Sequence, residues 1–296
     1  IFGCAGPVLR REERDFFRAV DPFGFILFAR NVEDPDQLRR LTGDLRAAVG
    51  REAPILVDQE GGRVQRLRAP HCREWDPPFD TVARAGADAE RVMKARATVI
   101  AAELIAVGID ANCAPVADVA RAATHPFLKN RCYGSDAGSV TRIARAVADG
   151  FLAAGVLPMM KHMPGHGLSH LDTHHDLPLV DAAPETLAAV DFAPFRALAD
   201  LPMAMTAHLV FSRIDPDRPA TQSPRMIEVI RHEIGYDGLL LTDDLNMEAL
   251  KGSLADRTRA SLAAGVDIAL HCKGDMDQMV EVAEAAGEMG VLARAR

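Results

Sequence analysis

Three features that this sequence lacks each exclude a class of protein. The five cysteines are widely spaced and form no C-x-x-C pair, which excludes a disulfide framework or structural zinc site and favours buried thiols in a reducing compartment. No apolar run approaches the roughly 20 residues of a membrane-spanning helix, and no signal-peptide pattern opens the chain. The 34 basic residues are outnumbered by 42 acidic ones, so we expect no basic surface for nucleic acid.

What the sequence does contain is a regular alternation of short apolar runs and longer amphipathic stretches. Its 296 residues suffice for one large α/β domain or two ordinary ones. Eight apolar runs predict buried strands over residues 1–4, 24–28, 54–57, 109–113, 156–160, 203–207, 238–241 and 266–271. The stretches between them predict helices over residues 12–20, 35–49, 87–107, 139–154, 184–198, 224–234 and 254–264. Proline follows Asp34, Ala183 and Ser223, at the first position of three of these helices.

Eight strands that alternate with helices predict a parallel sheet closed into a (β/α)8 TIM-type barrel. No low-complexity linker divides the chain, so we expect a single domain over residues 1–296. A doubly wound open sheet is the alternative. The absence of a G-x-G-x-x-G turn after the first strand counts against it.

Polar residues follow the predicted strands at the end where barrel enzymes place their chemistry. They are Asp58 and Arg63 after the third strand, Asp118 and Arg131 after the fourth, Lys161 and His162 at the fifth, His208 at the sixth, Asp243 and Met247 at the seventh, and His271 at the eighth. Because the carboxyl ends of barrel strands share one face, we expect these side chains to form one site.

The stretch after the fifth strand, residues 159–178, holds five of the ten histidines. Histidines recur every fourth residue from 162 to 174, as on one face of a helix. Pro164, Gly165 and Gly167 interrupt that helix in its first turns, so we predict a loop instead. Loops on a rigid scaffold commonly carry catalytic groups.

Two carboxylates and one histidine stand out chemically. Asp243 leaves a buried strand directly, where a carboxylate requires a partner or a substrate to offset its desolvation. His174 has Asp172 two residues before it, and such a pair can act as a general acid/base. Asp243 and Asp244 are alternatively a helix N-cap pair. Trp75, the sole tryptophan, is either a sugar platform or, as we expect, a packed loop anchor.

Four motifs in order resemble one family, the bacterial β-N-acetylglucosaminidases of glycoside hydrolase family 3. Residues 161–167, followed by Asp172-Thr173-His174, resemble its K-H-F-P-G-H-G…D-[ST]-H signature, with Met163 replacing the phenylalanine. Residues 58–64 (D-Q-E-G-G-R-V) are identical to its D-Q-E-G-G-R-V loop. Residues 130–134 and 242–247 are similar to its N-R-[SAC]-[FY]-G and [ST]-D-[DA]-L-x-M segments.

This resemblance implies a retaining hydrolysis. Asp243 is the implied nucleophile and His174 the implied acid/base, paired with Asp172. The implied sugar-binding residues are Asp58, Arg63, Arg131, Lys161, His162 and Met247. The implied substrate is a terminal β-linked N-acetylglucosamine (GlcNAc) on a 1,6-anhydro-muropeptide, cleaved in the cytoplasm during cell-wall recycling by a monomer without metal or organic cofactor. Typical members run further past the eighth strand, so we expect the last helix to be cut short.

Other functions stay open at this point. A metal-dependent hydrolase built on the histidine-rich loop is one, although no H-x-H or H-E-x-x-H pair is present. Attack by phosphate in place of water gives a phosphorylase, and a wider pocket gives a β-glucosidase. A non-catalytic sugar-binding protein is the alternative outside enzymes.

Overall fold

Eight parallel strands pair in chain order at the centre of the molecule. The computed structural model describes residues 1–169 and 177–296. In this part of the chain the sheet consists of β1 (Phe2–Gly3), β2 (Phe25–Leu27), β3 (Ile55–Val57), β6 (Ala111–Asn112), β7 (Leu157–Met163), β9 (Met203–Thr206), β11 (Leu239–Asp244) and β12 (Ile268–Leu270). A parallel bridge from Phe2 to His271 joins the last strand to the first and closes the sheet. The predicted (β/α)8 TIM-type barrel is confirmed, and the open doubly wound sheet is wrong.

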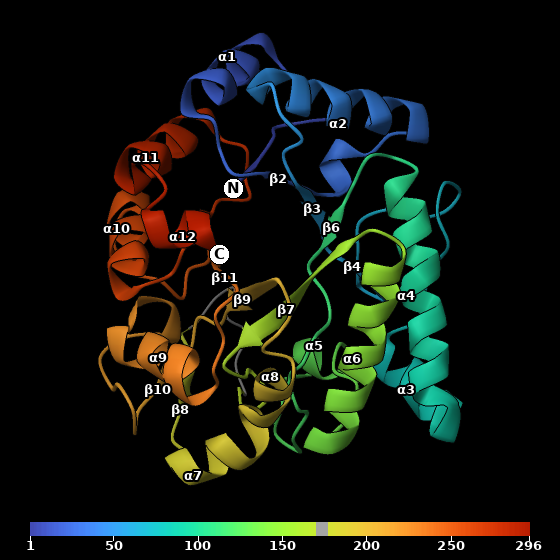
Figure 1. Ribbon diagram of the computed structural model, residues 1–296, viewed down its shortest axis with the longest axis vertical. Helices are drawn as coiled ribbons and strands as arrows, with labels where there is room; N and C mark the ends of the chain where they lie inside the picture. Colours follow the sequence, from blue (N-terminus) through green and yellow to red (C-terminus); the bar gives the residue numbers. More distant parts are fainter. Residues whose placement is uncertain (170–176) are drawn as a thin grey trace.

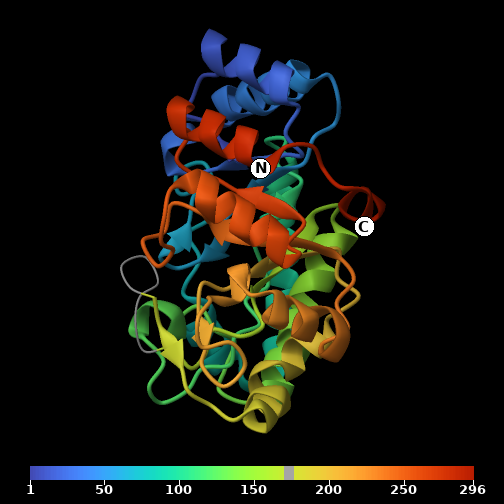
Figure 2. The ribbon, with the colours of Figure 1, turned by 90° about the vertical axis from the view of Figure 1, so that its left-hand side faces the viewer.

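Helices surround the barrel on its outside (Figure 1). The main ones are α1 (Arg11–Val20), α2 (Pro35–Val49), α3 (Pro78–Ala85), α4 (Ala89–Ile105), α6 (Ala137–Ala153), α10 (Leu254–Ala264) and α11 (Met276–Ala286). Shorter ones are α5 (Pro126–Lys129), α7 (Pro184–Thr186), α8 (Ala193–Ala197), α9 (Pro224–Glu228) and α12 (Val291–Ala295). Figure 2 shows α10 and α11, in orange and red, across one side of the barrel. No helix of the described residues is long and apolar enough to cross a membrane.

The predicted element bounds hold best where a cap defines them. Helix α2 has the predicted bounds: the Asp34 side chain accepts a hydrogen bond from the Gln37 backbone N–H at 2.8 Å, and Pro35 occupies its first position. Ser223 caps α9 in the same way. The helices predicted over 184–198 and 224–234 are instead interrupted by π-turns, at Leu187–Asp191 and Val229–Glu233. Strand β7 runs three residues beyond the predicted end, to Met163.

The core has two layers because side chains of a strand alternate between the barrel interior and the helices. Ile26 belongs to the interior cluster, whereas its neighbours Phe25 and Leu27 pack outward against the helical layer. Paired residues of adjacent strands fill the interior together, as Met159, Met203 and Leu239 do. The barrel interior is therefore a packed apolar layer, which forms a floor beneath the carboxyl ends of the strands.

Shortening an interior side chain will destabilise the barrel. Leu241 is fully buried in the interior cluster, so Leu241→Ala removes buried apolar contacts and leaves a cavity. We expect the free energy of unfolding to fall by about 2–5 kcal/mol in urea titrations. Leu152→Ala on α6, where the side chain is 44% exposed, is the matched control and should change it by less than about 0.5 kcal/mol. Equal losses in the two variants would contradict the two-layer core.

Candidate active site

A pocket opens at the carboxyl ends of the barrel strands. Its polar lining comes from the ends of β7 and β11 and from the segments after β3, β6 and β7, and consists of Asp58, Arg66, His125, Arg131, Lys161, His162, His166, Asp243 and Asp244. Met205 and Met247 supply part of its apolar wall. The barrel thus brings residues that are far apart in sequence, such as Asp58 and Met247, into one site, as predicted.

The structure brings together six of the residues predicted for the site. These are Asp58, Arg131, Lys161, His162, Asp243 and Met247. His174 and Asp172 lie outside the described residues. Arg63 does not line the pocket: its side chain is exposed, and its guanidinium carbon lies 3.7 Å from the centre of the Phe127 ring. The arginine of this loop that does line the pocket is Arg66.

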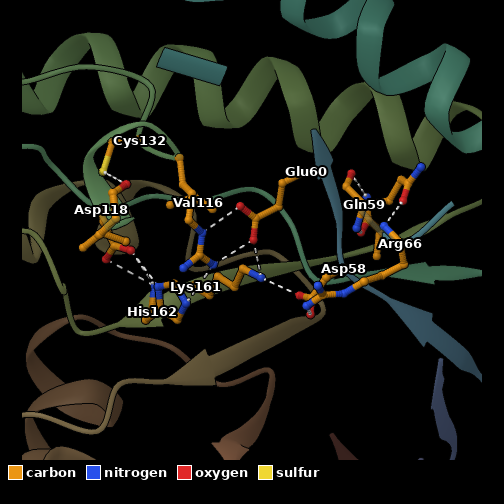
Figure 3. A network of polar contacts seen from close by, with 12 residues as sticks. Asp58, Gln59, Glu60, Arg66, Val116, Asp118, Cys132, Lys161 and His162 are labelled. Atoms are coloured by element: carbon orange, nitrogen blue, oxygen red, sulfur yellow. Dashed lines mark hydrogen bonds and ion pairs between the residues drawn. The ribbon is translucent and has the colours of Figure 1, made fainter. Parts of the chain in front are cut away.

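A buried network of charges forms one wall of the pocket (Figure 3). The Lys161 Nζ lies 2.8 Å from Asp58 Oδ1 and 2.6 Å from Glu60 Oε1. Arg131 donates two hydrogen bonds to the two oxygens of Glu60, at 2.9 and 2.8 Å. Arg66 Nη2 donates to Asp58 Oδ2 at 2.9 Å. Each carboxylate therefore has two cationic partners, and Lys161 bridges the two halves of the network.

The network keeps both of its carboxyl groups ionised. Burial raises the pKa of Asp58. Lys161 and Arg66 lower this pKa by more than burial raises it, so the pKa lies well below its usual range. Burial likewise raises the pKa of Glu60, and Arg131 and Lys161 bring it below the usual value. Burial alone lowers the pKa of Lys161, and its two carboxylate partners more than reverse this. The pocket wall therefore presents fixed charges at neutral pH.

Glu60 and Arg66 are site residues that the sequence analysis missed. Strand β4 (Gln59–Gly61) pairs antiparallel with β5 (Val64–Gln65), and this hairpin turns the chain back so that Arg66 reaches Asp58. Gly61 has a φ of 103°, and a Cβ on it would lie 1.8 Å from an Arg96 nitrogen, so this turn requires glycine. The D-Q-E spacing, with two carboxylates two residues apart, was the available signal for Glu60.

Asp243 lies in the pocket at the end of β11 as an ionised carboxylate. Burial raises its pKa, and His208, His162 and Lys161 lower it by more, so the pKa lies below the usual value. The pKa of His208 is itself lowered, because burial outweighs the opposing effect of Asp243. One carboxylate oxygen accepts a hydrogen bond from the Asp244 backbone N–H at 2.8 Å. A partly buried, ionised and oriented carboxylate has the properties of a nucleophile.

Asp244 holds the backbone that follows Asp243, and the N-cap interpretation of the pair is wrong. Both residues belong to β11, and the next helix, α10, starts ten residues later under a Ser253 cap. Asp244 Oδ1 accepts hydrogen bonds from the backbone N–H groups of Asn246 and Cys272, at 3.1 and 3.2 Å. The Asp244 carbonyl accepts from His208 Nε2 at 3.2 Å. The end of β11 is therefore held from two sides.

Three further predictions concern residues around the site. Trp75 is partly buried against the core, with its ring 5.2 Å from the Arg96 guanidinium, so it is the packed anchor that we expected. All five cysteines are free thiols. Among residues 1–169 and 177–296, no three His, Cys, Asp or Glu side chains are placed to hold a metal ion.

Known proteins resemble the chain over nearly its whole length. Residues 9–295 match the family model of the glycosyl hydrolase family 3 N terminal domain. A β-hexosaminidase of Alkalilimnicola ehrlichii is 40% identical over 281 residues, which cover 92% of this chain and 80% of that protein. One of Bordetella avium is 37% identical over 279 residues, 90% of this chain and 78% of that protein.

Solved structures agree with the sequence relatives. NagZ from Neisseria gonorrhoeae, in complex with N-trifluoroacetyl-D-glucosamine, has a TM-score of 0.90 and 30% identity, and the match covers 100% of this chain and 87% of that one. A family 3 β-N-acetylglucosaminidase from Paenibacillus has a TM-score of 0.87 and 32% identity over 96% of this chain, which spans 55% of that longer protein. The chain belongs to glycosyl hydrolase family 3. It is therefore a glycoside hydrolase, and the curated relatives that it matches are β-hexosaminidases.

Removing the bridging cation will destabilise the protein in a pH-dependent way. Lys161→Met leaves the carboxylates of Asp58 and Glu60 without the ammonium that bridges them. We expect the free energy of unfolding, measured in denaturant at neutral pH, to fall by about 3–5 kcal/mol. The wild-type pKa of both carboxyl groups is depressed, so their contribution persists until the pH falls below about 4. In Lys161→Met the repulsion between the Asp58 and Glu60 carboxylates favours their protonation. The difference in unfolding free energy between variant and wild type therefore shrinks as the pH falls from 7 towards 4.

Lys94→Met is the matched control, since Lys94 is exposed on α4. Its unfolding free energy should stay within about 0.5 kcal/mol of wild type across this pH range. A deficit in Lys161→Met that is independent of pH would contradict the charge network.

Proposed function

We propose that the protein is a retaining exo-β-N-acetylglucosaminidase, with residues 1–296 forming one catalytic barrel domain. Asp243 attacks the anomeric carbon of a terminal β-linked sugar and forms a covalent glycosyl-aspartate, which water then hydrolyses. One observation carries the proposal: Asp243 is a partly buried carboxylate in the pocket with a depressed pKa. Family membership and β-hexosaminidase relatives support it.

The charged wall supplies groups that suit a polyhydroxylated ligand. Asp58 offers acceptors for sugar hydroxyl groups, and Lys161 and Arg131 offer donors. We propose these three, with His162 and the apolar side chain of Met247, as the subsite for the terminal sugar. Arg66 joins them in place of Arg63, because Arg66 lines the pocket and Arg63 stacks on the outside of Phe127.

His174 is the proposed acid/base, with Asp172 as its partner. The assignment rests on the motif that follows β7, since both residues lie outside the described ones. An imidazole has a pKa near neutral pH, so it can protonate the leaving oxygen and then accept a proton from water. Most retaining enzymes use a second carboxyl group about 5–5.5 Å from the nucleophile instead.

We propose GlcNAc linked to 1,6-anhydro-muropeptides as the natural substrate, cleaved by a monomer in the cytoplasm during cell-wall recycling. The motif resemblance supports this substrate, and the complex of the gonococcal relative with N-trifluoroacetyl-D-glucosamine supports the terminal sugar. Hydrolysis of p-nitrophenyl N-acetyl-β-glucosaminide tests the activity directly. Faster release from the β-glucoside would indicate a β-glucosidase, release that requires phosphate a phosphorylase, and release abolished by a chelator a metal enzyme.

Replacing the nucleophile will abolish turnover. Asp243→Asn removes the negative charge that attacks the sugar, so kcat on the aryl N-acetylglucosaminide should fall by at least about a thousandfold. Asp244→Asn is the neighbouring control: an amide oxygen can still accept from the two backbone N–H groups that Asp244 binds, so the loss should be less than about tenfold. The reverse order of losses would reassign the nucleophile.

The acid/base role of His174 predicts a dependence on the leaving group. His174→Ala should reduce hydrolysis of a GlcNAc disaccharide, whose leaving oxygen requires a proton, by about 10²–10⁴-fold. p-Nitrophenolate leaves without a proton, so glycosylation of the enzyme by the aryl glycoside should be nearly unaffected in pre-steady-state bursts. Equal losses with both substrates would remove His174 from this role.

A further inference from the structure

Asp118 is a buried carboxylate that the proposed mechanism does not use. It lies after β6, is 0% exposed, and accepts hydrogen bonds from the base of the histidine-rich loop. Its Oδ1 lies 2.7 Å from the His166 backbone nitrogen, and its Oδ2 lies 2.7 Å from His162 Nδ1 (Figure 3). The His162 backbone N–H lies 3.3 Å from both oxygens. This is the binding pattern of an ionised carboxylate, and the pKa of Asp118 is accordingly lowered, since His162 outweighs the effect of burial.

The other side of the His162 ring faces a group that can only donate. His162 Nε2 lies 3.3 Å from Arg131 Nη2, and a guanidinium has five N–H donors and no acceptor. Nε2 must therefore accept in this contact, which places the ring proton on Nδ1, the nitrogen that faces Asp118. The two neighbours impose the same tautomer from opposite sides.

We propose that Asp118 is a positioning residue that holds His162 as its Nδ1–H tautomer and keeps Nε2 an unprotonated acceptor facing Arg131 and the sugar pocket. Its effect on the reaction rests on the proposed function, in which His162 binds the terminal sugar. In that role the single lone pair of Nε2 accepts from Arg131 in the free protein and from a sugar hydroxyl in its place once the sugar is bound, while Arg131 keeps its two hydrogen bonds to Glu60. Asp118 thus determines that His162 accepts, and does not donate, one hydrogen bond in the subsite, without itself touching the substrate.

The same carboxylate ties this ring to the entry of the histidine-rich loop. His166 donates its backbone N–H to Asp118, and Gly167 packs so tightly that a Cβ on it would lie 1.9 Å from the Val119 carbonyl oxygen. The His125 backbone N–H donates to the Ser169 carbonyl at 3.0 Å. The segment up to Ser169 is therefore held against the loop after β6, and this keeps the His166 N–H within hydrogen-bond distance of Asp118.

An asparagine at this position makes a sharp test, because the His166 N–H fixes its orientation. In Asp118→Asn the amide oxygen stays on that N–H, which leaves the amide NH₂ facing His162 Nδ1. Nδ1 must then accept, so the ring proton moves to Nε2 and faces the Arg131 donor. The substitution preserves the shape of the site and reverses the tautomer.

The test is histidine ¹⁵N NMR at neutral pH, with the His162 signals assigned by their loss in His162→Gln. In wild type we expect Nδ1 protonated and Nε2 not, and in Asp118→Asn the reverse. Asp191→Asn is the matched control, since Asp191 is another buried carboxylate near this loop, 2.8 Å from Arg121, and should leave the His162 tautomer unchanged. A wild-type ring with its proton on Nε2 would overturn the proposal without any variant. So would an unchanged tautomer in a folded Asp118→Asn.

Kinetics provides a second readout. We expect kcat/KM on the aryl N-acetylglucosaminide to fall about 10–100-fold in Asp118→Asn, mainly because KM rises. A loss of this size is typical when a residue that orients a functional histidine through a hydrogen bond is removed. A tautomer switch with unchanged kcat/KM would overturn the role of Asp118 in sugar binding. If wild type does not cleave the glycoside at all, the proposed function fails, whereas the tautomer assignment still stands or falls by the NMR result alone.

Discussion

The site depends on one interaction, the contact of the Lys161 ammonium with two buried carboxylates, Asp58 and Glu60. Ions cost several kcal/mol each to remove from water, and only close partners offset this. The partners come from different loops, so the network exists only while the barrel is closed and the strands stay in register. Lys161 lies on β7, and both carboxylates lie on the segment that follows β3, one strand beyond β6. A slip of one residue in β7 would point Lys161 to the other face.

The same cation links binding to chemistry. Asp243 is partly buried, and burial alone favours its protonated form, which cannot attack a sugar. His208 and His162 lower its pKa most, the hydrogen bond from the Asp244 backbone N–H lowers it further, and the Lys161 ammonium adds to them, so the proposed nucleophile is ionised at neutral pH. The apolar floor of the barrel interior strengthens this effect, because charges interact more strongly where water is excluded. The charged wall therefore lowers the pKa of the proposed nucleophile as well as shaping the pocket.

The sequence was sufficient for the barrel, since eight buried apolar runs separated by amphipathic stretches have few other solutions. The bounds of α2 followed from Asp34 and Pro35, a purely local signal. Local patterns were insufficient where the tertiary fold determines which side chain reaches the pocket. Arg63 and Arg66 are three residues apart in one motif, and only the β4–β5 hairpin determines that Arg66 enters the pocket. The π-turns after α7 and α9 have no local signature of this kind, and Asp118 acquires its role from the fold of β7 against the loop after β6.

Two buried histidines in this site show how partners determine what an imidazole does. His208 Nε2 faces the Asp244 carbonyl, an acceptor, so this nitrogen carries a proton, and Nδ1 lies 2.8 Å from the Thr221 hydroxyl oxygen. His162 has the opposite arrangement, with an acceptor at Nδ1 and the donor Arg131 at Nε2. The first ring braces the backbone behind the nucleophile, and the second presents an acceptor towards the pocket. A polyhydroxylated ligand is recognised by the order of donors and acceptors around it, so under the proposed function Asp118, a carboxylate that does not touch the sugar, helps to set that order beside the residues that do.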